Sequence, residues 1–316
     1  MFQLYKKREF SDYINDTFQF FKITGKHYFK NYFTINGFFL LAAAVLMYFL
    51  FKVYFEFIFS SISGGVQNNS MFQNLFQNNA GTIMTLVVLG LFFFYFLSLL
   101  QFAFPVLYLK LYDDKKGANF ETSDIITELK KSAFKLLKFT IGSIFIIFPI
   151  IMIVMFINIL LCIIIIGFPL LLITLPALMS WIHLSFYHYL SSEDTFFGSI
   201  SAGFGDLRQQ FWPIVFSTLI IYIIIQIVNT IFTMIPYVFG MASFYTTLND
   251  SQNVAADGLG FMSIMMTIIM VVSMIVSYIL NNLILINQGT IYYSQRDYDE
   301  NISEKSSIDM IGSDSE

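Results

Sequence analysis

Six separate stretches of this 316-residue chain are apolar enough, and long enough, to cross a lipid bilayer. Roughly 20 apolar residues in a helix span the hydrocarbon core. Only 12 % of the residues are charged, about half the share found in a soluble domain. The sequence therefore predicts an all-α integral membrane protein with six transmembrane helices. With a window of about 19 residues, the predicted spans are Phe33–Ile58, Ile83–Leu109, Phe139–Leu161, Phe168–Leu190, Ile214–Ile235 and Met262–Leu285.

The third and fourth spans form one apolar block, interrupted only by Gly167-Phe168-Pro169. At ~1.5 Å per residue, this block is too long for a single crossing. Glycine followed closely by proline is a strong turn signal. We therefore predict a tight transmembrane hairpin with its turn at these three residues.

The basic residues are distributed unevenly over the predicted loops. Lys and Arg favour the cytoplasmic side of a membrane in short loops, and sixteen of the 17 lie in segments that would share one side. The opposite loops, Ser61–Gly81 and Pro236–Gly260, contain none. We therefore predict that the N-terminus and the C-terminus are both cytoplasmic. The N-terminal segment lacks the order of a cleavable signal peptide, so we expect it to be retained.

Lys52 is the one basic residue within a predicted span, and it precedes Glu56 by four residues. Residues four apart lie on one face of a helix and can pair. A lysine near the end of a span also extends its ammonium group toward the interface. We interpret this pair as structural. The alternative is an ion or headgroup site, because charge within a membrane is commonly functional.

Amphipathic segments precede the first, third and fifth spans. In Asp124–Lys138 the apolar residues recur at steps of three and four, as on one face of a helix, and Ser123 is placed to cap its start. Related patterns occur in residues 10–26 and 200–211. We therefore predict three repeats of one unit, an interfacial amphipathic helix plus a transmembrane hairpin, at about 9–112, 120–192 and 195–295. The alternative is that these segments are not repeats, because aromatic belts and amphipathic linkers are common to membrane proteins.

The predicted repeats form a single six-span membrane domain, residues 1–295. The remaining residues, 296–316, contain seven acidic side chains and only Lys305 and Arg296 as basic ones. Acidic composition with few large apolar residues is typical of disordered segments. We predict an acidic, disordered cytoplasmic tail at residues 296–316.

Most of the sequence resembles a known family. The relevant stretches are Trp181-Ile182-His183-Leu184-Ser185-Phe186, then Ser192-Glu193-Asp194, then Gly198–Trp212 leading into a span, and finally Ile291-Tyr292-Tyr293-Ser294. Together they resemble the membrane domain of bacterial glycerophosphodiester phosphodiesterases and its free-standing membrane-protein relatives, over most of the chain. The phosphodiesterase catalytic domain has no counterpart here. The resemblance implies a multi-pass protein of the bacterial cytoplasmic (inner) membrane and supplies no catalytic residue.

The sequence carries no recognisable signature of catalysis, metal binding or nucleotide binding. His183 and His188 are five residues apart and point in different directions on a helix. HExxH, CxxC, EF-hand, P-loop and GxSxG patterns are absent. Cys162, the single cysteine, lies in an apolar run and is interpreted as a small hydrophobic residue. We therefore predict that the protein is not an enzyme and has no catalytic residue, cofactor or metal.

The spans contain uncharged amides near their centres and ends. These are Gln101, Asn158, Gln226, Asn229, Asn281, Asn282, Asn287 and Gln288. Amides within membranes commonly hydrogen-bond between helices, at about 0.6 kcal/mol each, and we interpret them in that way. The alternative is a polar cavity for a substrate or a lipid headgroup, lined by Gln226, Asn229, Asn281 and Asn282.

Two functions follow from these patterns. The first is a non-enzymatic scaffold or assembly subunit of a membrane complex, with a basic collar that engages anionic lipid headgroups or a protein partner. The collar residues are Lys22, Lys26, Lys30, Lys130, Lys131 and Lys135. The second is a permease or lipid-handling protein that uses the amide cavity. Nucleic-acid binding is not expected, because the basic residues lie where anionic headgroups would attract them.

Overall fold

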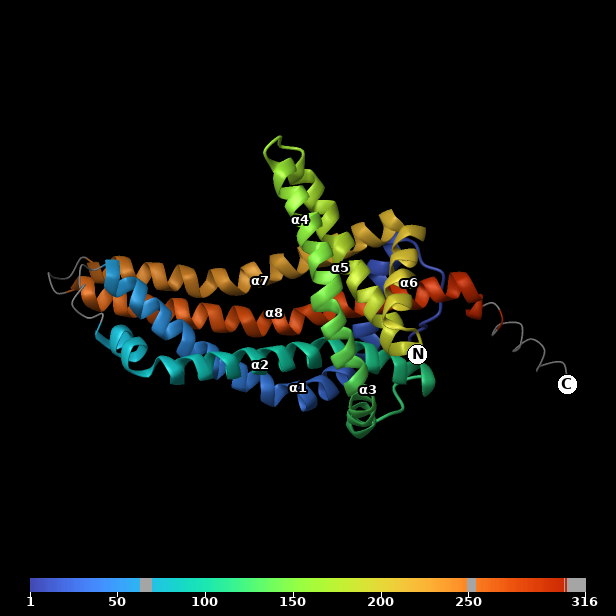
Figure 1. The fold of residues 1–316 in the computed structure, drawn as a ribbon, viewed down its shortest axis with the longest axis horizontal. Coiled ribbons are helices and arrows are strands. Elements are labelled where there is room, and N and C mark those ends of the chain that lie inside the picture. Colours follow the sequence, from blue (N-terminus) through green and yellow to red (C-terminus); the bar gives the residue numbers. More distant parts are fainter. Residues whose placement is uncertain (63–69, 249–253, 304, 306–316) are drawn as a thin grey trace. The chain divides into compact units, whose positions relative to one another are not determined.

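The computed structural model is built from helices (Figure 1) and describes residues 1–62, 70–248, 254–303 and 305. This part of the chain contains no strand, and six of its helices are long and apolar enough to cross a membrane. The predicted all-α, multi-pass membrane architecture is confirmed, whereas the three-repeat organisation stays a prediction. The elements are α1 (Phe10–Ile62), α2 (Ser70–Asp114), α3 (Thr122–Gly142), the π-helix η2 (Ser143–Ile147), α4 (Phe148–Cys162), α5 (Gly167–Ser191), α6 (Phe196–Gln209), α7 (Phe211–Leu248) and α8 (Val254–Glu300).

The chain divides into two compact units, where the sequence predicts one domain over residues 1–295. Unit 1 comprises Met1–Ile35, Phe102–Ile224 and Asn281–Glu316, and unit 2 comprises Asn36–Gln101 and Ile225–Leu280. Helices α1, α2, α7 and α8 each contribute residues to both units. The division is possible because each of these helices has many more residues than the roughly 20 that cross a bilayer core.

The first turn of α3 is stabilised by the acidic residue Asp124. The backbone N–H of Glu121 donates to Asp124 Oδ2 at 2.9 Å, and Glu121 is the N-cap residue. The prediction that Ser123 caps this helix is therefore wrong. Helix α3 continues through η2 into α4, so the amphipathic segment and the third span follow one another without an intervening loop. A short π-helical stretch of this kind widens the helix locally.

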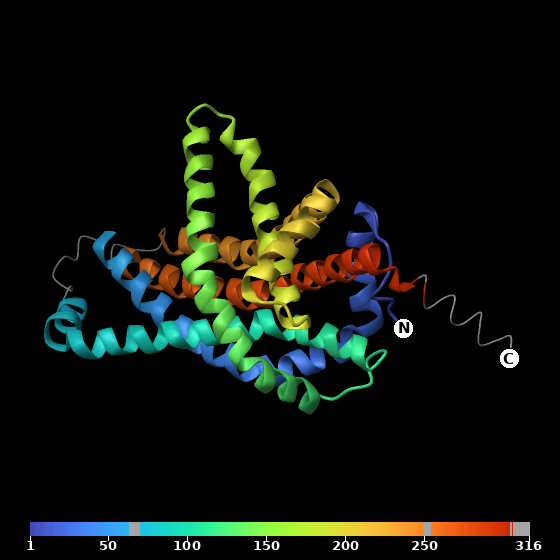
Figure 2. The same ribbon diagram turned by 45° about the vertical axis from the view of Figure 1, so that its right-hand side comes forward.

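Helices α4 and α5 form the predicted hairpin (Figure 2), although its turn lies earlier than predicted. The turn occupies residues 163–166, and Ile165 within it has a φ of 69°. Pro169 lies in the first turn of α5, where a proline costs no helical hydrogen bond. A Cβ on Gly167 would lie 2.3 Å from the backbone N of Cys162. Gly167 and Pro169 therefore lie in the first turn of α5. Only the close approach of the α4 and α5 backbones at Gly167 contributes to the turn between them.

The core of unit 1 is largely aromatic. Tyr28 lies fully buried, with ring centroids 5.1 Å from Phe104 and 4.8 Å from Tyr108 in edge-to-face geometry. Phe20 and Tyr32 extend this cluster along α1. Each such pair contributes about 0.5–1.5 kcal/mol beyond the apolar area that it buries. Ring packing thus joins the first part of α1 to the last part of α2.

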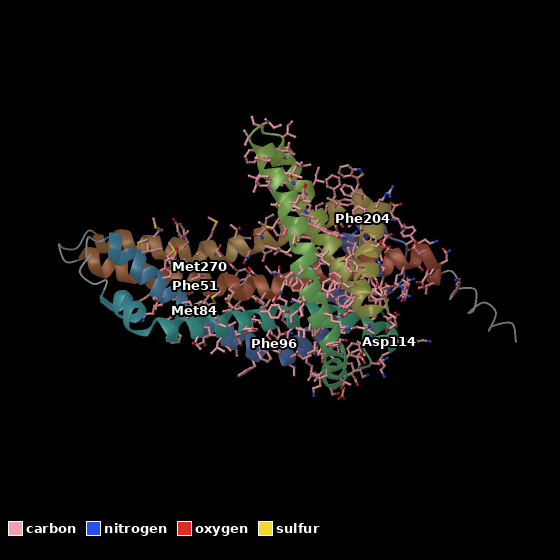
Figure 3. All side chains as sticks on the ribbon, viewed as in Figure 1. Phe51, Met84, Phe96, Asp114, Phe204 and Met270 are labelled. Atoms are coloured by element: carbon pink, nitrogen blue, oxygen red, sulfur yellow. The ribbon has the colours of Figure 1, made fainter. Side chains whose placement is uncertain are left out.

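Large apolar side chains also cover the outer surfaces of both units (Figure 3). Met84 is 67 % exposed in unit 2, and Phe204 is 56 % exposed in unit 1. Soluble monomers rarely expose extended apolar surface to water. The exposed apolar side chains therefore fit a lipid environment and agree with the multi-pass membrane architecture.

Helix α8 continues beyond the predicted end of the membrane domain, to Glu300. Asp297 is buried, and its carboxylate accepts hydrogen bonds from the backbone N–H and the hydroxyl of Ser303 at 2.7 and 2.6 Å. Residues 296–300 of the predicted tail therefore belong to α8. The hydrogen bonds from Ser303 stabilise the buried carboxylate of Asp297 in this part of the helix. Residues 304 and 306–316 of that tail lie outside the described residues, as does the side chain of Glu56.

Candidate functional site

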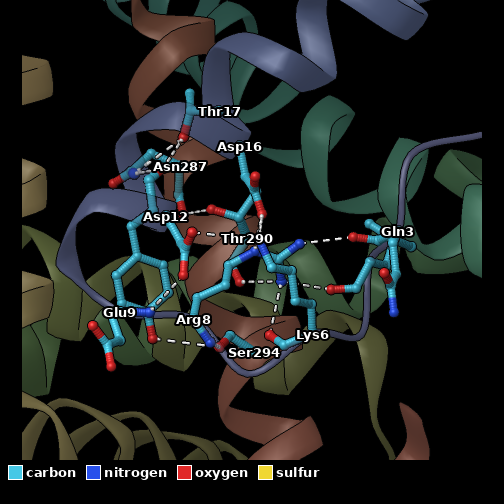
Figure 4. Close-up of polar contacts among 12 residues, drawn as sticks. Gln3, Lys6, Arg8, Glu9, Asp12, Asp16, Thr17, Asn287, Thr290 and Ser294 are labelled. Carbon is cyan, nitrogen blue, oxygen red and sulfur yellow. Dashed lines mark hydrogen bonds and ion pairs between the residues drawn. The ribbon is translucent and has the colours of Figure 1, made fainter.

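A dense polar cluster in unit 1 surrounds Arg8, in the segment that precedes α1 (Figure 4). The side chain of Arg8 is fully buried. Its Nε donates to Asp16 Oδ2 at 2.8 Å, its Nη1 to the carbonyl of Leu4 at 2.7 Å, and its Nη2 to the carbonyl of Gln3 at 2.7 Å. Every nitrogen of the guanidinium therefore has an acceptor, and the arginine holds the N-terminal segment against α1.

The same cluster connects α1 with α8 and with the start of α7. The backbone N–H of Arg8 donates to Ser294 Oγ at 3.0 Å. Asn287 Nδ2 donates to the carbonyl of Tyr13 at 3.1 Å, and the hydroxyl of Tyr13 donates to Gln210 Oε1 at 2.7 Å. These groups bind one another rather than facing an open cavity. The cluster therefore stabilises the fold and offers no ligand position.

A second polar chain runs from Arg296 through Tyr5 to Asp113. Arg296 Nη1 donates to the hydroxyl of Tyr5 at 3.2 Å, and that hydroxyl donates to Asp113 Oδ2 at 2.6 Å. Burial raises the pKa of Tyr5 above its ordinary value, and the hydrogen bond to Asp113 raises it further. Tyr5 therefore remains a hydrogen-bond donor over the whole physiological range and is unsuited to act as a base.

The three histidines lie apart, and each has its own partner. His27 Nε2 donates to the carbonyl of Phe120 at 2.9 Å, and its Nδ1 is hydrogen-bonded to the hydroxyl of Tyr108 at 2.8 Å. His183 Nδ1 contacts the carbonyl of Met179 at 2.6 Å, and His188 Nε2 contacts Asp206 Oδ2 at 2.8 Å. Across the described residues, no group of three or more His, Cys, Asp and Glu side chains could hold a metal ion.

The structure places the four predicted cavity residues in different surroundings. In unit 1, Asn282 is buried and its Oδ1 accepts from the hydroxyl of Tyr28 at 2.7 Å, whereas the neighbouring Asn281 is exposed. In unit 2, Asn229 donates to the hydroxyl of Ser277, and Gln226 is exposed. Asn282 and the Nδ2 group of the half-buried Asn229 thus bond to protein groups, although Asn229 Oδ1 is buried without a partner. These bonds favour the interpretation that the two amides stabilise the helix bundle.

Further predicted amides also pair across helices. Gln288 Nε2 donates to Thr218 Oγ1 at 2.8 Å, and Gln101 Nε2 donates to the carbonyl of Tyr278 at 3.1 Å. Each of these bonds joins segments far apart in the sequence but within the same unit. The amides therefore specify which helices are neighbours.

Half of the predicted basic collar lies on α1. Lys22, Lys26 and Lys30 are exposed and follow one another at steps of four residues, which places them on one helix face. No hydrogen bond or ion pair to another described residue involves their ammonium groups. We call these three residues the lysine row.

The other half of the collar lies on α3, and two of its three lysines have acidic partners. Lys131 Nζ lies 2.8 Å from Glu128 Oε1, and Lys135 Nζ lies 3.4 Å from Glu193 Oε1. Lys130 is exposed. The α3 lysines are thus largely neutralised by the chain itself, unlike the lysine row.

The buried pair Arg8–Asp16 and the partly buried pair His188–Asp206 were not predicted from the sequence. Arg8 precedes α1, so no helical periodicity aligns it with Asp16. Asp206 lies on an amphipathic segment, where polar residues are expected to face water. One signal was available: Gly203 allows α6 to approach α5 closely, since a Cβ there would lie 2.5 Å from the backbone N of Ser185.

Comparison with known proteins adds no relative. No protein-family model matches the sequence, and no curated protein or solved structure is significantly similar to it. The resemblance to glycerophosphodiester phosphodiesterase membrane domains therefore stays a prediction.

Proposed function

We propose that this chain is a non-enzymatic scaffold or assembly subunit of a membrane complex. The observation that carries the proposal is the lysine row on α1. Like charges four residues apart destabilise a helix by about 0.2–0.5 kcal/mol per pair. The lysine row therefore weakens its own helix, and it has no acidic partner among the described residues. An anionic surface outside the chain would compensate for this repulsion.

The surroundings of the row suit a protein partner. Phe18 and Ile23 are exposed beside Lys22, and these three residues lie with Asn15 and Gln19 on one face of α1. Protein interfaces typically combine an apolar centre with a polar rim. An acidic partner segment with apolar side chains would match this surface, and anionic headgroups would add to the attraction.

The polar interior of unit 1 supports a structural role. Arg8 and Asp16 bind each other, and Asn282 binds Tyr28. Such groups would be candidates for chemistry only if they faced a substrate. The proposal locates the protein in the bacterial cytoplasmic membrane with both termini cytoplasmic, so that the lysine row meets the anionic leaflet.

Site-specific photo-crosslinking in native membranes tests the proposal. Lys26 is replaced by the photoreactive residue p-benzoylphenylalanine, and Lys115, exposed before α3, is replaced in the same way as a control. Illumination is expected to join the position-26 variant to one discrete protein and to leave the position-115 variant without that adduct. Adducts with lipid alone at both positions, or no adduct at position 26, would contradict the proposal.

A further inference from the structure

An apolar groove of about 390 Å³ lies between α4, α5 and α6, entirely within unit 1. Val154 contributes to it from α4, Ala177 and Trp181 from α5, and Phe204 and Leu207 from α6. Phe204 is more than half exposed, so the groove is open on the side of α6. These walls belong to the surface that the membrane architecture directs toward lipid.

The few polar atoms along the groove are already satisfied. Thr174 Oγ1 donates to the carbonyl of Leu170 at 2.9 Å. Trp181 Nε1 donates to the carbonyl of Ile200 at 3.1 Å. A polar ligand would lose its hydrogen bonds to water on entry and gain none in return. The groove therefore suits a hydrocarbon chain.

The dimensions select an acyl chain over a partner helix. A helix about 10 Å across that rises ~1.5 Å per residue would place only about three residues in this volume. Along α5 the groove extends from Trp181 to Leu170, which is about 16 Å at the same rise. One leaflet of a bilayer core ~30 Å thick has about this depth. The groove thus matches the hydrocarbon of a single leaflet.

Arg208 supplies a charge beside the groove. It follows Phe204 by four residues and therefore lies on the same face of α6. Its side chain is exposed, and no hydrogen bond or ion pair joins it to any described residue. Trp212, 54 % exposed, follows closely, and tryptophan is enriched at membrane interfaces. A guanidinium group matches the geometry of a phosphate.

We propose that this groove binds one acyl chain of an anionic phospholipid, whose phosphate is held by Arg208. The site goes beyond the scaffold function and does not rest on it, since the lysine row lies on α1. A result against lipid binding in the groove would therefore leave the scaffold function unaffected, and the reverse also holds.

The two tryptophans of the chain allow a direct test. Trp212→Phe leaves Trp181, which lines the groove, as the only tryptophan. The variant is reconstituted in phosphatidylcholine vesicles that contain a small fraction of either phosphatidylglycerol or phosphatidylcholine with brominated acyl chains. Bromine quenches tryptophan fluorescence at short range. The brominated phosphatidylglycerol is expected to quench Trp181 at about one-fifth of the mole fraction needed for brominated phosphatidylcholine.

Two further substitutions, in the Trp212→Phe background, assign the groove and the charge. Arg208→Gln is expected to remove the preference for phosphatidylglycerol, whereas Lys130→Gln, at an exposed lysine on α3, is expected to keep it. Ala177→Phe fills the groove and is expected to protect Trp181 from both brominated lipids. Equal quenching by both lipids, or a preference that survives Arg208→Gln, would overturn the proposal. Because Arg208 is exposed, Arg208→Gln is expected to fold. Its quenching result therefore tests the proposal even if Ala177→Phe fails to fold.

Discussion

The cluster around Arg8 in unit 1 and the helices of unit 2 are stabilised by different kinds of contact. In unit 1, Arg8 is fully buried and each guanidinium nitrogen has an acceptor. In unit 2, the described contacts include isolated bonds such as Asn229 to Ser277 and ring pairs such as Phe39 with Phe96 at 5.4 Å. Removing one member of a buried charged pair destabilises a protein strongly, because the other charge is left without a partner. Each apolar contact contributes little by itself, so the stabilisation is spread over many atoms.

The difference follows from what surrounds each region. Lipid chains are as apolar as leucine, so helices in a membrane gain little from burying apolar side chains against each other. Packing and occasional amide bonds then suffice to select neighbours. The segment before α1 has no helical hydrogen bonds of its own to fix its course, and Arg8 binds its carbonyl groups instead. The cluster around Arg8 should therefore be more sensitive to single polar substitutions than the helices of unit 2.

The largest expected effect is that of Arg8→Met. The substitution leaves Asp16 buried without its partner, and removal of one member of a buried ion pair typically costs 3–5 kcal/mol, so we expect a loss of about 4 kcal/mol in the free energy of unfolding. Arg8→Lys should restore little of this, because an ammonium group cannot reproduce the fork of a guanidinium. Reversible unfolding in mixed micelles provides the measurement.

Lys7→Gln is the matched control for this prediction. Lys7 is the neighbouring cation, and its exposed hydrogen bond to Asn301 should be worth less than about 0.5 kcal/mol. Equal stability of Arg8→Met and the wild type would show that the cluster does not stabilise unit 1.

A pair of glycines on α6 gives the next largest effect. Gly203→Ala places a Cβ 2.5 Å from the backbone N of Ser185, whereas a Cβ on Gly205 meets nothing within 4 Å. We expect Gly203→Ala to cost about 1–3 kcal/mol by overpacking. Gly205→Ala should stabilise the helix by up to about 1 kcal/mol. Thermal unfolding of both variants measures the difference, and equal shifts in the same direction would refute the close packing of α5 and α6.

The smallest effects compare one amide in each unit. Asn282→Leu leaves the buried hydroxyl of Tyr28 without this acceptor, which should cost about 1–2 kcal/mol. Asn229→Leu in unit 2 should cost only about 0.6 kcal/mol. Combining Tyr28→Phe with Asn282→Leu should recover part of the loss, because both polar groups are then removed. If Asn229→Leu proves the more damaging of the two single variants, the contrast between the units is wrong.

The spans could be predicted from the sequence because a bilayer imposes a length and a polarity on every crossing. The turn before α5 was misplaced, since Gly167 and Pro169 are turn signals that also suit the first turn of a helix. The amides were recognised as candidates, but their partners were not. Asn287 bonds to Thr17 at 3.1 Å, and no spacing rule connects residues so far apart.

The basic collar illustrates the same limit. In the sequence its six lysines are equivalent, because each lies on the polar face of an amphipathic segment. The structure distinguishes them by their neighbours: Glu128 pairs with Lys131, while Lys22, Lys26 and Lys30 face outward. Charge can be counted from a sequence, but neutralisation depends on the tertiary contacts.

The composition of the complex recovered from native membranes tests the central claim most directly. Mild solubilisation, affinity capture and mass spectrometry are applied to the wild type, to Lys22→Glu/Lys26→Glu/Lys30→Glu and to Asn229→Leu/Asn281→Leu. The scaffold function predicts a stoichiometric protein partner that the lysine-row variant loses and the amide variant keeps. A wild-type protein recovered without a protein partner, or a partner lost only with the amides, would contradict it.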